Sequence, residues 1–202
     1  IKVGKNLNKN IIGKNFIIGD KNICRSFNMS PECENCKKNR GIFCLKKSSR
    51  KFNDKTYGGY SDYFVRSYYQ SEKINNSVNP KFGIFAEPIA CAINCSRRYV
   101  NGSILIYGLG TISLLFYRIL LINKINEDKI FLLVKNNEQL KQARLIGYKN
   151  IILKNKLNSL HNIFDNLFYF NGKIDLDRII LKNLKPLSKI VLFGSIKKLN
   201  FD

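Results

Sequence analysis

The chain has 202 residues, enough for two small domains, and 45% of them are hydrophobic, which suffices for a core. Its net charge is +21 at pH 7, from 35 Lys and Arg against 14 Asp and Glu. These cations are spread along the whole length together with frequent Asn and Ile, a pattern that argues against nucleic-acid binding. The excess positive charge still favours phosphorylated ligands.

The sequence predicts no contact with a membrane. The N-terminal residues have no apolar segment typical of a signal peptide. Residues 103–123 are apolar, but Gly108, Gly110 and Arg118 interrupt them, and the two halves are typical of a strand and a helix. We therefore expect a cytoplasmic protein whose thiols stay reduced rather than forming disulfides. The chain begins with Ile1 rather than methionine, which suggests an incomplete polypeptide.

A cysteine-rich loop is the first feature that carries chemistry. Cys33, Cys36 and Cys44 give the spacing C-x2-C-x7-C within a polar segment. Thiolates spaced in this way can converge on one tetrahedral zinc ion. Three thiolates leave the tetrahedron one ligand short.

The fourth ligand is an open question in the sequence. Ser30 stands where a further C-x2-C step would place a sulfur, and a hydroxyl is a poor zinc ligand. Cys24 or Glu32 could take its place after a rearrangement of the loop. The sequence therefore indicates either a weakened zinc site or a relic that no longer binds metal.

Two segments lie between this loop and the second half. Residues 57–64 place aromatic side chains around a glycine pair and predict a strand that leaves a turn. Residues 85–95 predict an apolar helix with Glu87 near its start, beside Pro88. A carboxylate there complements the helix dipole, and its functional alternative is a metal or cofactor contact at a domain junction.

The second half predicts a nucleotide-binding α/β domain. The strand 103–107 ends in Gly108-Leu-Gly110, with Ser113 where the third glycine of a G-x-G-x-x-G pattern would stand. Strands at 129–134, 151–153, 164–170 and 190–193 alternate with helices at 137–146 and 176–184, a pattern that indicates a parallel sheet. His161 falls in a surface linker. An α/β sheet without a cofactor is the alternative.

The order of these pieces resembles the zinc-containing medium-chain alcohol and polyol dehydrogenases, and most closely the sorbitol, threonine and polyol branch. The likeness spans nearly the whole chain. It implies a Rossmann-type dinucleotide-binding domain at residues 99–202, preceded at 1–98 by part of a GroES-like, β-rich catalytic domain. The segments that carry it are Gly19-Asp20, the cysteine loop, Gly58-Gly59-Tyr60, Glu87–Cys91, Gly108–Gly110, Ala143–Gly147, Asn171-Gly172 and Lys185-Pro186 through Gly194.

The resemblance also implies roles for residues. Glu87 becomes the catalytic and metal-site candidate, while Cys33, Cys36 and Cys44 become three of the four ligands of a structural zinc. Val134 stands where the family often has an acidic residue for the ribose, so NADP is expected to bind more tightly than NAD. The cofactor-binding residues that the resemblance implies are Gly108, Gly110, Thr111, Ile112, Lys135, Asn171, Phe193 and Gly194.

The implied function is NAD(P)-dependent, zinc-assisted oxidation of an alcohol, polyol or sugar alcohol, with or without a phosphate group, in an enzyme that can be a homo-oligomer. The family's upstream cysteine and His-Glu pair have no counterpart here, nor does its closing segment. We therefore expect a fragment or a degraded copy, inactive on alcohols by itself. Two alternatives stay open: a non-catalytic dinucleotide-binding module, and a basic zinc-loop nucleic-acid-binding protein.

Overall fold

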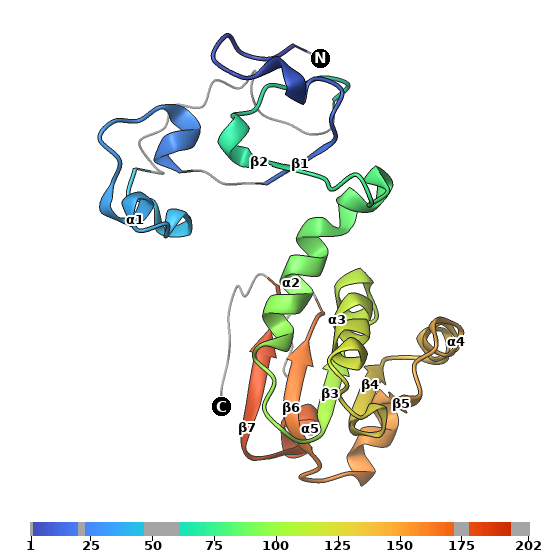
Figure 1. Ribbon diagram of the computed structural model, residues 1–202. Coiled ribbons are helices and arrows are strands. Elements are labelled where there is room, and N and C mark those ends of the chain that lie inside the picture. Colours follow the sequence, from blue (N-terminus) through green and yellow to red (C-terminus); the bar gives the residue numbers. More distant parts are fainter. Residues whose placement is uncertain (1, 20–22, 47–60, 172–177, 195–202) are drawn as a thin grey trace. The chain divides into compact units, whose positions relative to one another are not determined.

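The computed structural model describes residues 2–19, 23–46, 61–171 and 178–194. The chain forms two compact units, residues 1–86 and 87–202 (Figure 1). The division falls at the start of helix α2 (Ala86–Ser96). The boundary predicted between residues 98 and 99 lies at the other end of the same helix.

A five-stranded, wholly parallel sheet forms the centre of the second unit. Its strands are β3 (Ile104–Tyr107), β4 (Ile130–Val134), β5 (Asn150–Leu153), β6 (Phe164–Tyr169) and β7 (Leu184–Leu192). The order across the sheet is β5-β4-β3-β6-β7, and the order reverses between β3 and β6. This is the strand order of the dinucleotide-binding fold, which binds its ligand at that switch point. The predicted parallel sheet is confirmed.

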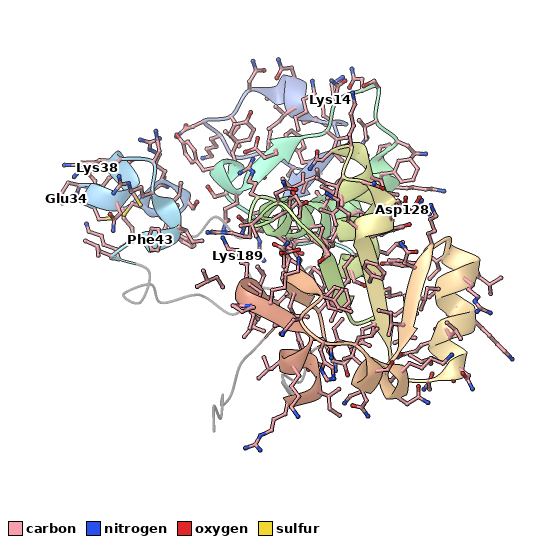
Figure 2. The ribbon with its side chains drawn as sticks, turned by 90° about the horizontal axis from the view of Figure 1, so that it is seen from below. Lys14, Glu34, Lys38, Phe43, Asp128 and Lys189 are labelled. Atoms are coloured by element: carbon pink, nitrogen blue, oxygen red, sulfur yellow. The ribbon has the colours of Figure 1, made fainter. Side chains whose placement is uncertain are left out.

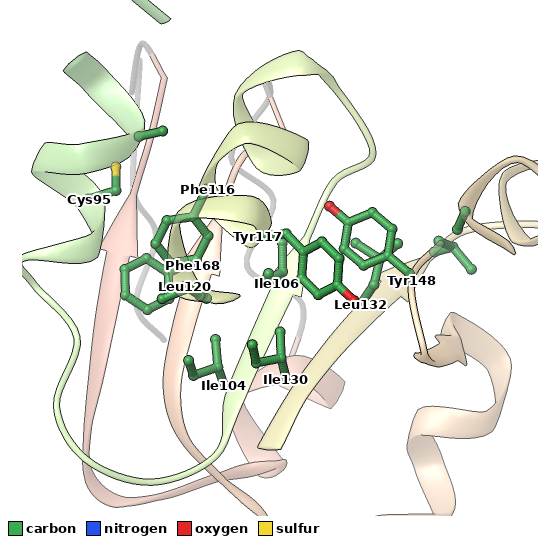
Figure 3. Close-up of a cluster of buried hydrophobic side chains, with 13 residues drawn as sticks. Cys95, Ile104, Ile106, Phe116, Tyr117, Leu120, Ile130, Leu132, Tyr148 and Phe168 are labelled. Carbon is green, nitrogen blue, oxygen red and sulfur yellow. The ribbon is translucent and has the colours of Figure 1, made fainter. Parts of the chain in front are cut away.

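Alternate side chains of the strands build two cores. On one face Ile104 and Ile106 pack under α2, α3 (Thr111–Ile122) and α4 (Asn137–Ile146), and Figure 3 shows Phe116 of α3 against Phe168 of β6. On the other face Leu105 and Tyr107 pack with the 3-10 helix η8 (Lys154–Ser159) and α5 (Arg178–Lys182). No helix in the described part of the chain is long and apolar enough to cross a membrane.

The last strand differs from the prediction. β7 begins at Leu184 rather than near Ile190, so it includes Pro186, and its pairing with β6 is irregular between Phe164 and Asn166. Leu187 has a left-handed backbone, with φ of 63°. Because β7 lies at the edge of this sheet, a proline without an N–H and a bulge are both tolerated there.

The first unit has little regular structure among its described residues. Its one sheet there pairs β1 (Phe16–Ile18) antiparallel with β2 (Ser71–Lys73). The predicted strand at 57–64 is wrong for residues 61–64, where Tyr63 is 84% exposed and has no partner strand to pack against; residues 57–60 lie outside the described residues. The short helices are η1 (Lys9–Ile11), η2 (Cys24–Phe27), α1 (Glu34–Lys37), η3 (Gly41–Phe43), η5 (Tyr68–Gln70) and η6 (Pro80–Phe85).

Candidate dinucleotide site and cysteine cluster

The turn after β3 contains two glycines in different settings. Gly108 has φ of 112°, and a Cβ there would lie 3.0 Å from the carbonyl carbon of Phe170 and 3.2 Å from the nitrogen of Asn171. Gly110 has an ordinary extended backbone, and a Cβ there would meet nothing within 4 Å. Gly108 therefore serves the close approach of β3 to the end of β6. Gly110 leaves open space in front of α3.

This open space faces the first turn of a helix. Gly110 is the N-cap of α3, and Thr111 and Ile112 are its first two residues. Their amides have no partner within the helix, so a helix start of this kind is suited to an anion. Ser113, fully buried, takes the third glycine position and binds the backbone of Gly110 through its hydroxyl.

The remaining candidates follow other strands at the same edge of the sheet. Lys135 comes after β4, Asn171 after β6, and Phe193 and Gly194 after β7. Because all five strands are parallel, their carboxyl ends meet at one edge. The structure thus brings every predicted cofactor residue to the edge that holds Gly108.

Two details of this edge bear on the ribose position. Val134 is fully buried in the core, so it presents no polar group to a ligand. Lys135 is exposed, and its Nζ lies 5.9 Å from the centre of the Tyr107 ring. On the side of β7, the rings of Phe193 and Phe170 lie 5.7 Å apart.

Four cysteines gather in the first unit. The Sγ atoms of Cys24, Cys33, Cys36 and Cys44 all lie within 4.8 Å of one another, and all four side chains are buried. The Sγ of Cys44 lies 3.7 Å from that of Cys24 and 3.9 Å from that of Cys33. Figure 2 shows sulfur atoms in the same lobe as Glu34, Lys38 and Phe43.

These distances fit a tetrahedral metal site. Four sulfurs at the usual zinc–sulfur bond length stand about 3.8 Å apart. Cys24 therefore supplies the fourth thiol that the loop seemed to lack, and the expectation that Ser30 leaves the cluster one ligand short is corrected. The backbone N–H of Cys36 lowers the pKa of Cys33, while burial raises the pKa of Cys36. A cation that replaces the protons would relieve this burial cost.

Glu87 has a different setting. It is exposed in the first turn of α2, and the Cys91 thiol donates to its Oε1 at 3.0 Å. That hydrogen bond, together with burial, raises the pKa of Cys91 to about 11. Within the described residues, the four-cysteine cluster is the only group of three or more metal-binding side chains, and Glu87 is not in it. His161 is exposed, as predicted.

The chain resembles known proteins in its fold. No family model and no curated protein matches the sequence. Acetophenone reductase from Geotrichum candidum, in complex with NAD, matches with a TM-score of 0.71 and 16% identity over 100% of this chain and 59% of that one. Galactitol-1-phosphate dehydrogenase from Escherichia coli gives 0.63 and 19% over 84% and 51%.

A third structure matches to a similar extent. A zinc-binding dehydrogenase from Sinorhizobium meliloti, bound to NADP, matches with a TM-score of 0.60 and 18% identity over 84% of this chain and 53% of that one. The chain thus spans between half and three fifths of the length of these three structures. Its parallel five-stranded sheet and small antiparallel sheet match the fold of the corresponding parts of these reductase and dehydrogenase structures.

Proposed function

We propose that this chain is the dinucleotide-binding and zinc-lobe part of an NAD(P)-dependent oxidoreductase that acts on alcohols or polyols. The turn at Gly108 and Gly110 carries the proposal. It joins a backbone that only glycine can adopt to an open space before a helix, and it lies at the switch point between β3 and β6. The likeness to dehydrogenases solved with NAD and with NADP supports it.

In this proposal each part of the edge has its own task. The amides of Thr111 and Ile112 bind the pyrophosphate, and Lys135 offers its charge to the adenosine ribose or its phosphate. Asn171, Phe193 and Gly194 border the nicotinamide and shield it from water. The bound dinucleotide supplies the hydride chemistry, and the protein supplies orientation.

The four cysteines fit a structural zinc. They are buried and close enough for tetrahedral ligation. A tetrathiolate site is closed, so it stabilises a lobe and does not take part in the reaction.

The catalytic metal would be held by Glu87 together with further ligands, none of which the described residues bring to it. Glu87 would contribute one oxygen, and an open catalytic zinc ordinarily has three protein ligands. Such a zinc lowers the pKa of a bound alcohol. We therefore propose that the chain by itself binds a dinucleotide but does not oxidise alcohols, and that the complete enzyme takes an alcohol, polyol or sugar-alcohol substrate. The net charge of +21 favours a phosphorylated one, as in galactitol-1-phosphate dehydrogenase.

The cofactor site is tested by substituting Gly110→Ala. A methyl group there has room in the free protein but enters the space proposed for the pyrophosphate. We expect titration calorimetry to show at least a roughly tenfold loss of NAD and NADP affinity, about 1.4 kcal/mol. Gly4→Ala, at another glycine with nothing within 4 Å and no positive φ, is the matched control. Unchanged affinity in the Gly110 variant would overturn the proposed site.

A further inference from the structure

The cysteine cluster includes a ligand that its own sequence motif does not explain. Cys33 is the N-cap of α1 and Cys36 lies within that helix, so the helix sets the distance between them. Cys24 comes from η2, nine residues before Cys33. Closing a longer loop costs more conformational entropy than closing a short one. A contact between the two ends of this loop would help to hold Cys24 against the other thiols.

An ion pair spans the two ends of this loop. The Nε of Arg25 donates to Oε1 of Glu32 at 2.5 Å. Arg25 directly follows Cys24, and Glu32 directly precedes Cys33. The pair therefore ties together the two backbone segments from which two of the thiols project.

We propose that the Arg25–Glu32 pair positions Cys24 as the fourth ligand of the metal. The inference rests on the zinc lobe proposed above and concerns how this chain completes it. Cys24 also reaches the cluster through its backbone, since its N–H donates to the Sγ of Cys36 at 3.4 Å. Arg25 and Glu32 are positioning residues in this account, because neither is among the four ligands.

The surroundings of the two side chains agree with this role. The Arg25 guanidinium is charged at any ordinary pH, so it can pair with the Glu32 carboxylate. The Oε2 of Glu32 is buried without a hydrogen-bond partner in the described part of the chain, so Arg25 is the group seen to hold this carboxylate.

The ion pair by itself adds little to the stability of the fold. The Arg25 side chain is 47% exposed, and exposed pairs contribute little to the free energy of unfolding. Its effect is expected in the metal affinity instead. The two residues adjoin Cys24 and Cys33 in the sequence, so loss of the pair should let Cys24 move away from the cluster.

The test measures zinc affinity in the full chain. Arg25→Met and Glu32→Gln should each weaken zinc binding roughly two- to fivefold in competition with a chromogenic chelator, the size expected for an exposed ion pair. Arg25→Lys keeps the charge and should recover part of the loss. With Co²⁺ as the probe, the wild-type spectrum should be that of four sulfurs, and the two weakened variants should lose one sulfur. Cys24 should then be the thiol that becomes open to alkylation.

The surface pair of Lys149 and Asp128, whose atoms lie 2.6 Å apart in the second unit, supplies the matched control. Lys149→Met and Asp128→Asn should leave zinc binding unchanged. Circular dichroism and dinucleotide binding would show that each variant is folded. Wild-type affinity and a four-sulfur spectrum in both Arg25→Met and Glu32→Gln would overturn the inference. A wild-type chain that holds no zinc would instead overturn the metal site itself.

Discussion

The Oγ of Ser113 accepts a hydrogen bond from the N–H of Gly110 at 2.9 Å and donates one to the carbonyl of Gly110 at 2.8 Å. The residue in the third glycine position thus closes the turn that the two glycines begin. Because Ser113 is fully buried, this closure happens beneath the open face of the turn. The departure from the glycine motif is a local capping arrangement that leaves the space above Gly110 free.

Removing this hydroxyl should destabilise the second unit. Ser113→Ala leaves the Gly110 N–H without its partner, and loss of such a cap typically costs about 1 kcal/mol in the free energy of unfolding. Urea denaturation would measure it. Ser96→Ala, which removes a hydroxyl bonded to the Ile93 carbonyl in α2, should have a smaller effect. Equal losses in the two variants would contradict the role assigned to Ser113.

A second prediction concerns the opposite edge of the sheet. Asp165 accepts hydrogen bonds from the Nζ of Lys185 at 2.9 Å and from the N–H and hydroxyl of Ser103 at 2.8 and 2.9 Å. The bond from Lys185, followed by those from Ser103, lowers the pKa of Asp165 below its ordinary 3.8. A lowered pKa stabilises the fold above the ordinary value, and this stability is lost as the pH falls through the lowered value.

The pH dependence of one variant should show this directly. Asp165→Asn should be less stable than the wild type at pH 7, and the difference should shrink at pH values well below 3.8. Denaturation midpoints across that range would measure both chains. Asp128→Asn, at an exposed carboxylate visible in Figure 2, is the control and should change little at any pH. A difference between wild type and Asp165→Asn that does not depend on pH would refute the assignment.

Most of the second unit could be predicted because its signals are local. Apolar runs mark β3 and β4, and α4 has the predicted bounds because Asn136 caps its start and Gly147, at φ of 92°, ends it. The edge strand was harder to predict. Pro186 suggests a break in an isolated sequence, and tolerance for it depends on the position of β7 in the finished sheet.

The fourth cysteine, Cys24, could not be assigned to the cluster from sequence spacing. Spacing identifies Cys33 and Cys36 because a short turn fixes their distance. Cys24 joins them through a fold-dependent approach of η2, which no spacing rule contains. The single hint in the sequence was a further cysteine upstream of the motif. For Glu87 the situation is reversed. The family resemblance suggests a metal-site role, but within the described residues its side chain is seen to bond only the thiol of Cys91.

Cofactor preference is a third testable point. NADP should bind more tightly than NAD, because Val134 offers no carboxylate to repel the 2′-phosphate and Lys135 lies beside it. Lys135→Ala should reduce this preference a few-fold, and added salt should reduce it in the wild type. Lys141→Ala, at an exposed lysine of α4, is the control. Calorimetry that gives equal or better affinity for NAD in the wild type would refute the prediction.

The last prediction separates the two residues that compete for the fourth ligand position. Cys24 lies in the cluster, 3.7 Å from Cys44 between sulfurs, whereas Ser30 is exposed and outside it. Cys24→Ser should therefore lower zinc stoichiometry well below one per chain after dialysis against a weak chelator, because three thiolates hold the ion less tightly than four. Ser30→Ala should leave it at one.

Adding a sulfur at residue 30 provides the decisive comparison. Ser30→Cys in the wild-type background should not raise zinc binding, since four thiols already fill the tetrahedron. In the Cys24→Ser background the same change should restore some of the lost zinc if the loop can rearrange. Metal analysis of the wild type and these four variants measures the differences. Zinc retained by Cys24→Ser and lost by Ser30→Ala would mean that residue 30, with a water or its own hydroxyl, completes the site instead.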